Sequence, residues 1–187
     1  MVRSKQKLET KPRTLTPAQK KFVVHWGEMG SRWGVNRTEA QIHALLYITA
    51  RPLTAEEIAT TLGVARSNVS TSLRDLQGWG IIKASHQLGD RRDHFESLAD
   101  VWEMARIIGE ERKRRELDPT LALLRECVAE VGPGDPSTRQ RLSAMLELFE
   151  AADAAYQATR GVSTSDLRRL VALRGRAQKL LKLAIGR

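Results

Sequence analysis

The sequence has few of the features that hold proteins together covalently or fix them to a membrane. Its 187 residues include one cysteine, Cys127, so neither an intrachain disulfide nor a cysteine-based zinc site can form within one chain. The four histidines do not repeat at the spacing of helical metal ligands, and we expect no metal site. No stretch approaches the roughly 20 apolar residues that cross a bilayer, and the N-terminal segment lacks the apolar run of a signal peptide. We therefore expect a cytoplasmic protein with no membrane partner.

Sequence patterns of catalysis are also missing. We find no glycine-rich phosphate loop, nucleophile elbow or paired carboxylates, which predicts a protein that is not an enzyme and needs no cofactor. Positive charge is in excess: 31 Lys and Arg against 22 Asp and Glu give a formal net charge of +9. Such a charge favours a polyanionic partner, because neutralising phosphates releases counterions. The same charge also serves solubility, so motifs must decide between the two interpretations.

Composition divides the chain into three parts. Residues 1–15 are basic and contain almost nothing to bury, which predicts a disordered basic arm. Residues 16–99 combine helical patterns with a β-hairpin, and we interpret them as a winged helix-turn-helix domain. Residues 100–187 are helical again and form the expected linker and dimerisation region. The predicted fold class is mainly α with a small β-hairpin wing (α+β).

Local start signals set the expected elements. A capping residue, often followed three positions later by Gln or Glu, predicts helix starts at Thr16, Asn36, Thr54, Asp118, Ser137 and Ser163. A further helix is expected from about Arg66 to Trp79. Two short alternating segments between Ile81 and Ser97 flank the turn sequence Leu-Gly-Asp-Arg-Arg, which indicates a hairpin.

Residues 53–97 carry the functional prediction. Ala59 is small enough for close helix packing, and Gly63 four residues later supplies the turn of a helix-turn-helix. At 100° per residue, Val69, Leu73 and Leu76 share the face expected to point to the core. The polar residues of the same helix are the candidate DNA contacts: Arg66, Ser67, Asn68, Ser70, Thr71 and Arg74. Short hydroxyls permit close approach to the major groove, and Arg74 is the leading candidate for reading a guanine. An ordinary solvated helix face is the alternative.

The hairpin tip adds candidate contacts of a second kind. Arg91 and Arg92 stand in a glycine turn, and arginine suits the narrow, electronegative minor groove. Asp90 and Asp93 flank them and either orient the guanidinium groups or neutralise the tip. Lys83 and His86 are expected to contact the DNA backbone. Exposure to solvent alone explains these two equally well.

With these motifs in hand, the chain resembles the MarR superfamily, and within it the GbsR-like branch of small bacterial transcription regulators. The similarity runs from about Phe22 to Leu117 and rests on FVVHWGEMGSRWGVNRTEAQIHALLYI, ARSNVSTSLRDLQGWGII and ADVWEM. Two departures are Ala65, where the family usually has a serine cap, and the wing sequence GDRRD, where an arginine-lysine pair is commoner. The resemblance implies a nucleoid-associated homodimer that binds pseudo-palindromic promoter sites and represses transcription until a small molecule relieves it.

The C-terminal apolar residues exceed what one small domain needs, and we expect them to form the dimer interface, with Leu142, Leu146, Phe149, Leu170 and Leu181 as representatives. Packing against the winged domain of the same chain is the alternative. The resemblance also implies an effector of the quaternary ammonium type, for which aromatic rings are suited, and the candidates are Trp26, Trp33 and Trp102. Aromatic residues at helical spacing are otherwise plain core. Cys127 is either a redox sensor or, as its apolar neighbours favour, an inert thiol.

The sequence therefore predicts a sequence-specific, double-stranded DNA-binding transcription regulator, with repression as the expected mode. The alternative is an architectural DNA- or RNA-binding protein that uses its basic surface without sequence preference.

Overall fold

The computed structural model describes residues 14–160, 162–163, 165–166, 168–169 and 173. The chain divides into two compact units, Met1–Ile107 and Ile108–Arg187, each of which is described by itself. Most of the predicted basic arm (1–13) and the predicted interface residues Leu170 and Leu181 lie outside the described residues.

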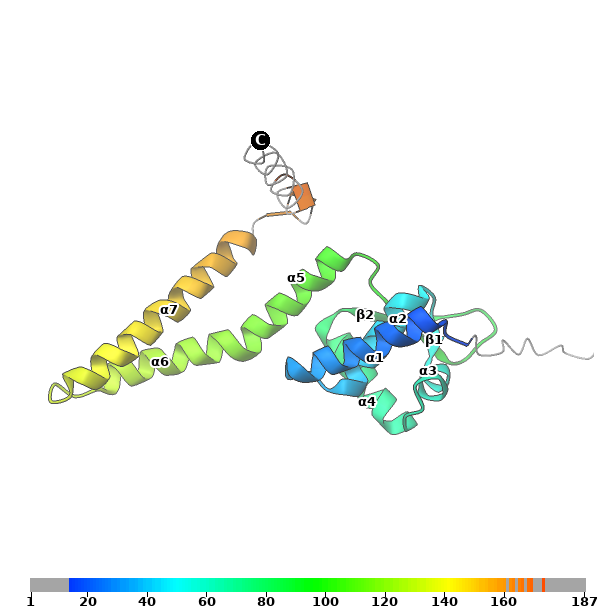
Figure 1. The fold of residues 1–187 in the computed structure, drawn as a ribbon, viewed down its shortest axis with the longest axis horizontal. Helices are drawn as coiled ribbons and strands as arrows, with labels where there is room; N and C mark the ends of the chain where they lie inside the picture. The colour runs from blue at the N-terminus through cyan, green and yellow to red at the C-terminus, as the bar shows by residue number, and fades with distance from the viewer. Residues whose placement is uncertain (1–13, 161, 164, 167, 170–172, 174–187) are drawn as a thin grey trace, which may run out of the picture. The chain divides into compact units, whose positions relative to one another are not determined.

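The first unit is helical with one small sheet (Figure 1). Its elements are α1 (Pro17–Arg32), α2 (Arg37–Thr49), β1 (Leu53–Thr54), α3 (Ala55–Leu62), α4 (Arg66–Trp79), β2 (Ile82–His86), β3 (Asp93–Ser97) and the start of α5 (Val101–Arg112). Complete capping boxes open α1 at Thr16 and α3 at Thr54, and the Asn36 side chain caps α2, as the sequence predicts. The order helix, turn, helix, hairpin is that of a winged helix-turn-helix.

The core of this unit is centred on α2. Ile42, Leu45 and Leu46 are at most 1% exposed and pack with the inner faces of the neighbouring helices. α1 approaches α2 closely because Gly30 has no side chain: a Cβ there would lie 2.5 Å from the Cβ of Ala40. The close crossing leaves the opposite side of α2 free to support α4. The core thereby fixes the position of the helix that carries the candidate DNA contacts.

The sheet has the strand order β1-β3-β2, antiparallel throughout. The hairpin β2-β3 pairs Ile82 with Ser97 at its base and His86 with Asp93 near its tip, which confirms the predicted hairpin. Strand β1 was not predicted. Its two residues pair with Phe95 and His94 of β3 and join the hairpin directly to the start of α3.

The second unit contains the end of α5, a π-helical segment Lys113–Leu117, α6 (Asp118–Glu130) and α7 (Pro136–Arg160). Helix α6 begins at Asp118, but the predicted capping role of Asp118 is wrong, because Asp118 is itself helical and its backbone N–H donates to the carbonyl of Lys113 five residues earlier. Pro119 lacks an N–H and cannot make the usual bond to the carbonyl four residues before it, and the wider π turn accommodates this without ending the helix.

The predicted start of α7 at Ser137 is displaced as well. The capping side chain is that of Asp135, whose Oδ1 accepts from the backbone N–H of Thr138 at 3.0 Å. Ser137 donates its hydroxyl to the same carboxylate. By contrast, Ser163 accepts from the N–H of Asp166 at 3.1 Å, as its capping pattern predicts. No helix among the described residues is long and apolar enough to span a membrane.

Candidate nucleic-acid interface

Helix α4 has one buried face and one open face, divided as the sequence predicts. Val69, Leu73 and Leu76 are 0%, 2% and 1% exposed, and burial of such side chains contributes roughly 1.5–3 kcal/mol each. The six candidate contacts all lie on the exposed side: Arg66, Ser67, Asn68, Ser70, Thr71 and Arg74. The turn before α4 is made by Gly63 with φ +66°, a left-handed conformation that favours glycine. Helix α4 is thus held to the core by its apolar face and exposes its polar face to solvent.

The first turn of α4 has no side-chain cap. Ala65 has the extended backbone of a capping residue but no oxygen to offer, and neither Ser67 nor Asn68 replaces it. The first N–H groups of a helix carry the positive end of its dipole, and without a cap they remain available to an anion such as a DNA phosphate. Because position 65 is an alanine and not a serine, no capping side chain accepts from the backbone N–H groups at the start of α4, where Arg66 lies.

The cationic candidates differ in whether they are already paired. In the part of the chain that the structure describes, the guanidinium groups of Arg66 and Arg74 make no ion pair. Lys83 instead lies on β2 with its Nζ 3.0 Å from Oε1 of Glu96 on β3. Because Glu96 offsets its charge, Lys83 is a weaker candidate for a phosphate contact than either arginine of α4.

The two arginines of the wing, residues 82–97, differ in the same way. Arg91 is exposed and makes no hydrogen bond or ion pair among the described residues. The Arg92 guanidinium is bound to Asp90, with its Nη2 2.6 Å from Oδ2. Hydrogen bonds from the side chain and backbone of Arg92 hold the pKa of Asp90 well below its ordinary value. Of the two roles that the sequence leaves open for Asp90, orienting an arginine or neutralising the tip, this contact is the first.

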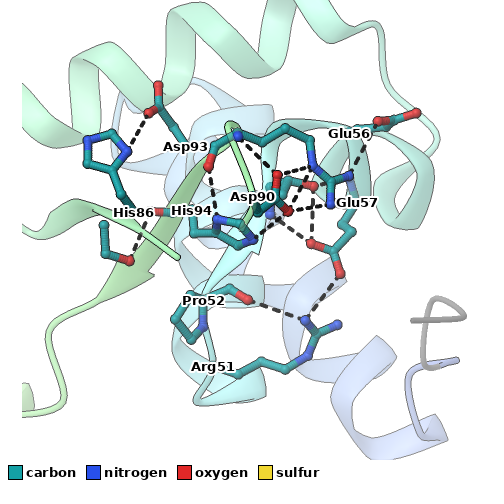
Figure 2. A network of polar contacts seen from close by, with 11 residues as sticks. Arg51, Pro52, Glu56, Glu57, His86, Asp90, Asp93 and His94 are labelled. Carbon is teal, nitrogen blue, oxygen red and sulfur yellow. Dashed lines mark hydrogen bonds and ion pairs between the residues drawn. The ribbon is translucent and has the colours of Figure 1, made fainter. Parts of the chain in front are cut away.

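Further polar contacts lie within the wing and between the residues beside it (Figure 2). Asp93 does not orient an arginine but lies beside His86, with 3.4 Å between Oδ1 and Nδ1. His94 is buried, and its Nδ1 lies 3.0 Å from the carbonyl of Arg92. Arg51 contacts Glu57 of the α3 capping box at 3.2 Å. Sequence reasoning missed His94, whose position beside the turn depends on the strand register.

The tryptophans proposed for an effector site take different positions. Trp26 is half-buried with its ring 5.2 Å from that of Phe22, Trp102 is half-buried on α5, and Trp33 is 59% exposed. Two surface hollows, one beside Val23 and Thr61 and one beside Phe149 and Tyr156, have no tryptophan in their lining. The effector assignment therefore stays a prediction.

The remaining candidates are Cys127 and the residue types that bind metals. Cys127 is half-buried on α6, which tests neither its redox role nor its inertness. Among the described residues, no group of three or more His, Cys, Asp or Glu side chains is placed to hold a metal ion.

Comparison with known proteins agrees with the geometry of the first unit. The MarR family model matches residues 33–93, the part that contains the helix-turn-helix and most of the wing. A solved structure described as a transcriptional regulator has a TM-score of 0.62 and 23% identity, over 78% of this chain and 97% of that chain. This likeness shows the fold.

Two other solved structures are more distant. A MepR mutant of Staphylococcus aureus bound to an oligodeoxyribonucleotide has a TM-score of 0.37 and 17% identity, over 72% of this chain and 89% of that chain. A ZitR mutant of Lactococcus lactis has a TM-score of 0.32 and 22% identity, over 61% and 75%. No curated protein matches the chain.

Proposed function

We propose that a chain with this winged-helix fold is a sequence-specific, double-stranded DNA-binding transcription regulator that acts as a homodimer and represses its target promoter. The observation that carries the proposal is the division of α4: three buried apolar anchors on one face, and on the other short hydroxyls with two arginines that make no ion pair among the described residues. This is the surface that a major groove accepts, because small polar side chains allow close approach and arginine donates twice to guanine. Repression follows when the bound dimer covers sequence that the polymerase needs.

Several finer assignments remain predictions that accompany this proposal. The GbsR-like branch rests on the sequence resemblance, as does relief of repression by a quaternary ammonium effector at Trp26, Trp33 or Trp102. A DNA-bound role predicts a cytoplasmic, nucleoid-associated protein. The candidate base and phosphate contacts are those of α4 and the wing. Architectural binding without sequence preference is the competing function.

Titration of the protein with DNA from upstream of its own gene, against the same DNA scrambled, tests the proposal. We expect clearly tighter binding to the natural sequence at a fixed salt concentration. Equal affinity for the two would support architectural binding instead, because phosphate contacts alone do not distinguish sequences.

Substitution Arg74→Ala should weaken binding to the natural site by about 1–3 kcal/mol, or roughly 5- to 150-fold, with little loss on scrambled DNA. The reason is that a base contact contributes to the specific complex alone. Fluorescence anisotropy with both DNAs measures the two losses. Arg114→Ala is the matched control, because Arg114 is also exposed but is paired with Glu111 on the second unit. A uniform loss on both DNAs would assign Arg74 to a phosphate.

The described part of the second unit has a small core, and this supports the homodimer. Among its described residues, only Leu121 is fully buried. Leu142, Leu146 and Phe149 are half-buried on one face of α7. That face also carries Asp153, which pairs with Lys113, so it points to the neighbouring helix of the same chain. Those three residues are thus partly used within one chain.

Three exposed apolar side chains of α6 and α7 offer more to a second copy. Leu123, Met145 and Leu148 are 58%, 47% and 64% exposed, which is costly for apolar side chains of this size. We assign the dimer interface to these three side chains. A two-fold dimer would place two α4 helices about 34 Å apart, one turn of DNA.

Leu148→Lys should convert the dimer to monomer, because a charge replaces an apolar contact at the interface. Light scattering coupled to size-exclusion chromatography measures the mass. Leu88→Lys, at an exposed leucine of the wing, should remain dimeric. A monomeric wild-type protein, or an unchanged mass for Leu148→Lys, would contradict the assignment.

A further inference from the structure

We propose that the hollow beside Val23 and Thr61 binds a small carboxylate with an aliphatic body, and that this ligand weakens DNA binding through the turn of the helix-turn-helix. The binding site is independent of the proposed function, whereas the effect on DNA rests on it. The hollow has a volume of about 410 Å³ and is lined by residues of the first unit alone. Sites for small molecules have volumes of about 300–1,000 Å³ and combine apolar walls with a few polar groups.

The walls of the hollow are aliphatic. Leu15 lines it before α1, Val23 and Val24 line it on α1, and Leu62 lines it at the end of α3. Val24 is 45% exposed, so a ligand that covers it gains free energy by removing apolar surface from water. Among the described residues, no aromatic side chain contributes to the lining. These walls suit an alkyl chain, which needs apolar area and no ring to stack on.

The polar part of the lining favours a negative charge. Lys20 of α1 is the one charged residue among the described residues of the lining. Lys20 is exposed, and its ammonium makes no ion pair in the part of the chain that the structure describes. An ammonium with no carboxylate beside it in the lining attracts an anion and repels a cation. A carboxylate fits because it accepts charge-assisted hydrogen bonds from an ammonium.

The side of the hollow that α2 forms is fixed before a ligand arrives. Gln41 lines it, and a Cβ at Gly27 of α1 would lie only 2.5 Å from Cγ of Gln41. The glutamine side chain therefore lies directly against the backbone of α1, where only glycine leaves it room. Its amide is half-buried and restricted in its rotamers. A ligand that binds there has less side-chain freedom to immobilise, which favours binding.

The last turn of α3 connects the hollow to the helix-turn-helix. The backbone N–H groups of Gly63 and Val64 both donate to the carbonyl of Ala59. Thr61 and Leu62, which line the hollow, lie between these donors and their acceptor along the chain. The lining and the turn before α4 thus belong to one hydrogen-bonded unit. A ligand inserted between α1 and this unit shifts the turn and with it the start of α4, so DNA binding should weaken.

Titration of the isotope-labelled full chain without DNA, followed by the NMR shifts of its amides, tests the site. The probes are hexanoate, hexanol and hexyltrimethylammonium, which share one alkyl chain and have a negative charge, no charge and a positive charge. We expect a dissociation constant of about 1 mM for hexanoate, weaker binding of hexanol and none of the cation. The largest shifts should be those of the lining residues and Gly63. Equal binding of the three probes, or no saturable binding of hexanoate, would overturn the site.

Lys20→Met and Lys21→Met form a matched pair, because both remove a positive charge from exposed lysines of α1 but Lys21 does not line the hollow. Lys20→Met should weaken hexanoate binding about 3- to 10-fold and leave hexanol binding unchanged, since only the charged head loses a partner. Lys21→Met should bind both probes like the wild type. Val24→Phe, which fills the hollow from its exposed edge, should lose both. Equal loss of hexanoate binding in the two lysine variants would mean that net charge attracts the probe, and would overturn the site.

The effect on DNA is measured with the operator, the natural DNA site of the proposed regulator, by fluorescence anisotropy. Saturating hexanoate should weaken operator binding by the wild type about five-fold and by Val24→Phe not at all. Because coupling is reciprocal, operator DNA should weaken hexanoate binding by the same factor. Unchanged operator affinity with hexanoate bound would overturn the coupling. If the wild type binds no DNA with sequence preference, the proposed function fails, and the titration without DNA still decides whether the hollow is a carboxylate site.

Discussion

Leu73→Ala should lower the free energy of unfolding by about 2–5 kcal/mol, the largest loss we expect from one substitution. Leu73 is 2% exposed and belongs, with Val69 and Leu76, to the face by which α4 is held against the core. The change removes buried methyl groups and leaves a cavity that rigid neighbours fill poorly. Because a domain is stable by only about 5–15 kcal/mol, such a loss also depletes the folded fraction that can bind DNA. Urea unfolding followed by circular dichroism measures the effect.

Leu88→Ala is the matched control, since it deletes the same atoms from a fully exposed leucine. We expect a change within about 0.5 kcal/mol. The pair separates the loss of a buried side chain from the loss of an exposed one: the first variant loses operator affinity through unfolding, and the second keeps the stability of the wild type. A small effect of Leu73→Ala would show that α4 is not anchored through this face and would remove the basis for its outward presentation.

Much of the first unit could be predicted from sequence because its signals are local. The hydroxyl of Thr16 or Thr54 and the residue three positions later lie within one turn, so the capping pattern contains both partners of the hydrogen bonds. The division of α4 follows from helical geometry once Val69 and Leu73 are known. These elements could be predicted without knowing what surrounds them.

The second unit shows where a local pattern misleads. Asp118 followed by Pro119 has the composition of a helix start, yet the helix continues through a π turn that the same proline requires. The Lys113 side chain contacts the carboxylates of both Asp118 and Asp153, and the second of these is on α7. The side chain of Asp118 is thus bound by Lys113, which also makes a tertiary contact with Asp153, and a pattern of adjacent residues contains no information about that contact.

The sequence names the candidate residues of the interface but does not predict which of them form ion pairs with other side chains. Lys83, Arg91 and Arg92 are equivalent in the sequence as basic residues of one hairpin. The register that places Lys83 opposite Glu96 and brings Arg92 near Glu56 separates them. Strand β1 also depends on tertiary structure, because its two residues become a strand only when β3 lies alongside. Which cations are free to meet DNA is therefore a tertiary property.

The acid stability of the fold should depend on His43, which lies in α2 with 6% of its surface exposed. Its Nε2 lies 3.3 Å from Sδ of Met104, and since a thioether only accepts, Nε2 carries a hydrogen. Ser97 donates to the same sulfur. The cluster joins α2, β3 and α5, the elements behind the wing.

Burial lowers the pKa of His43 from 6.5 to about 4. Between these values the unfolded chain binds a proton that the folded protein excludes, so stability rises with pH across this window. His43 imposes no cost above pH 6.5 and a cost of about 3 kcal/mol once the pH has fallen to 4. The carboxylates of Asp135 and Asp153, whose pKa values are lowered by hydrogen bonds from Thr138 and Lys113, add their own loss at the acid end.

His43→Gln separates the two contributions, because glutamine keeps an N–H near the sulfur but cannot take up a proton. Urea unfolding at pH 7, 6, 5 and 4.5 should show a shallower decline for this variant than for the wild type. His86→Gln, at an exposed histidine of the wing, should decline like the wild type. Parallel curves for His43→Gln and wild type would contradict the lowered pKa of His43, because they would mean that the ring takes up its proton equally in the folded and unfolded protein.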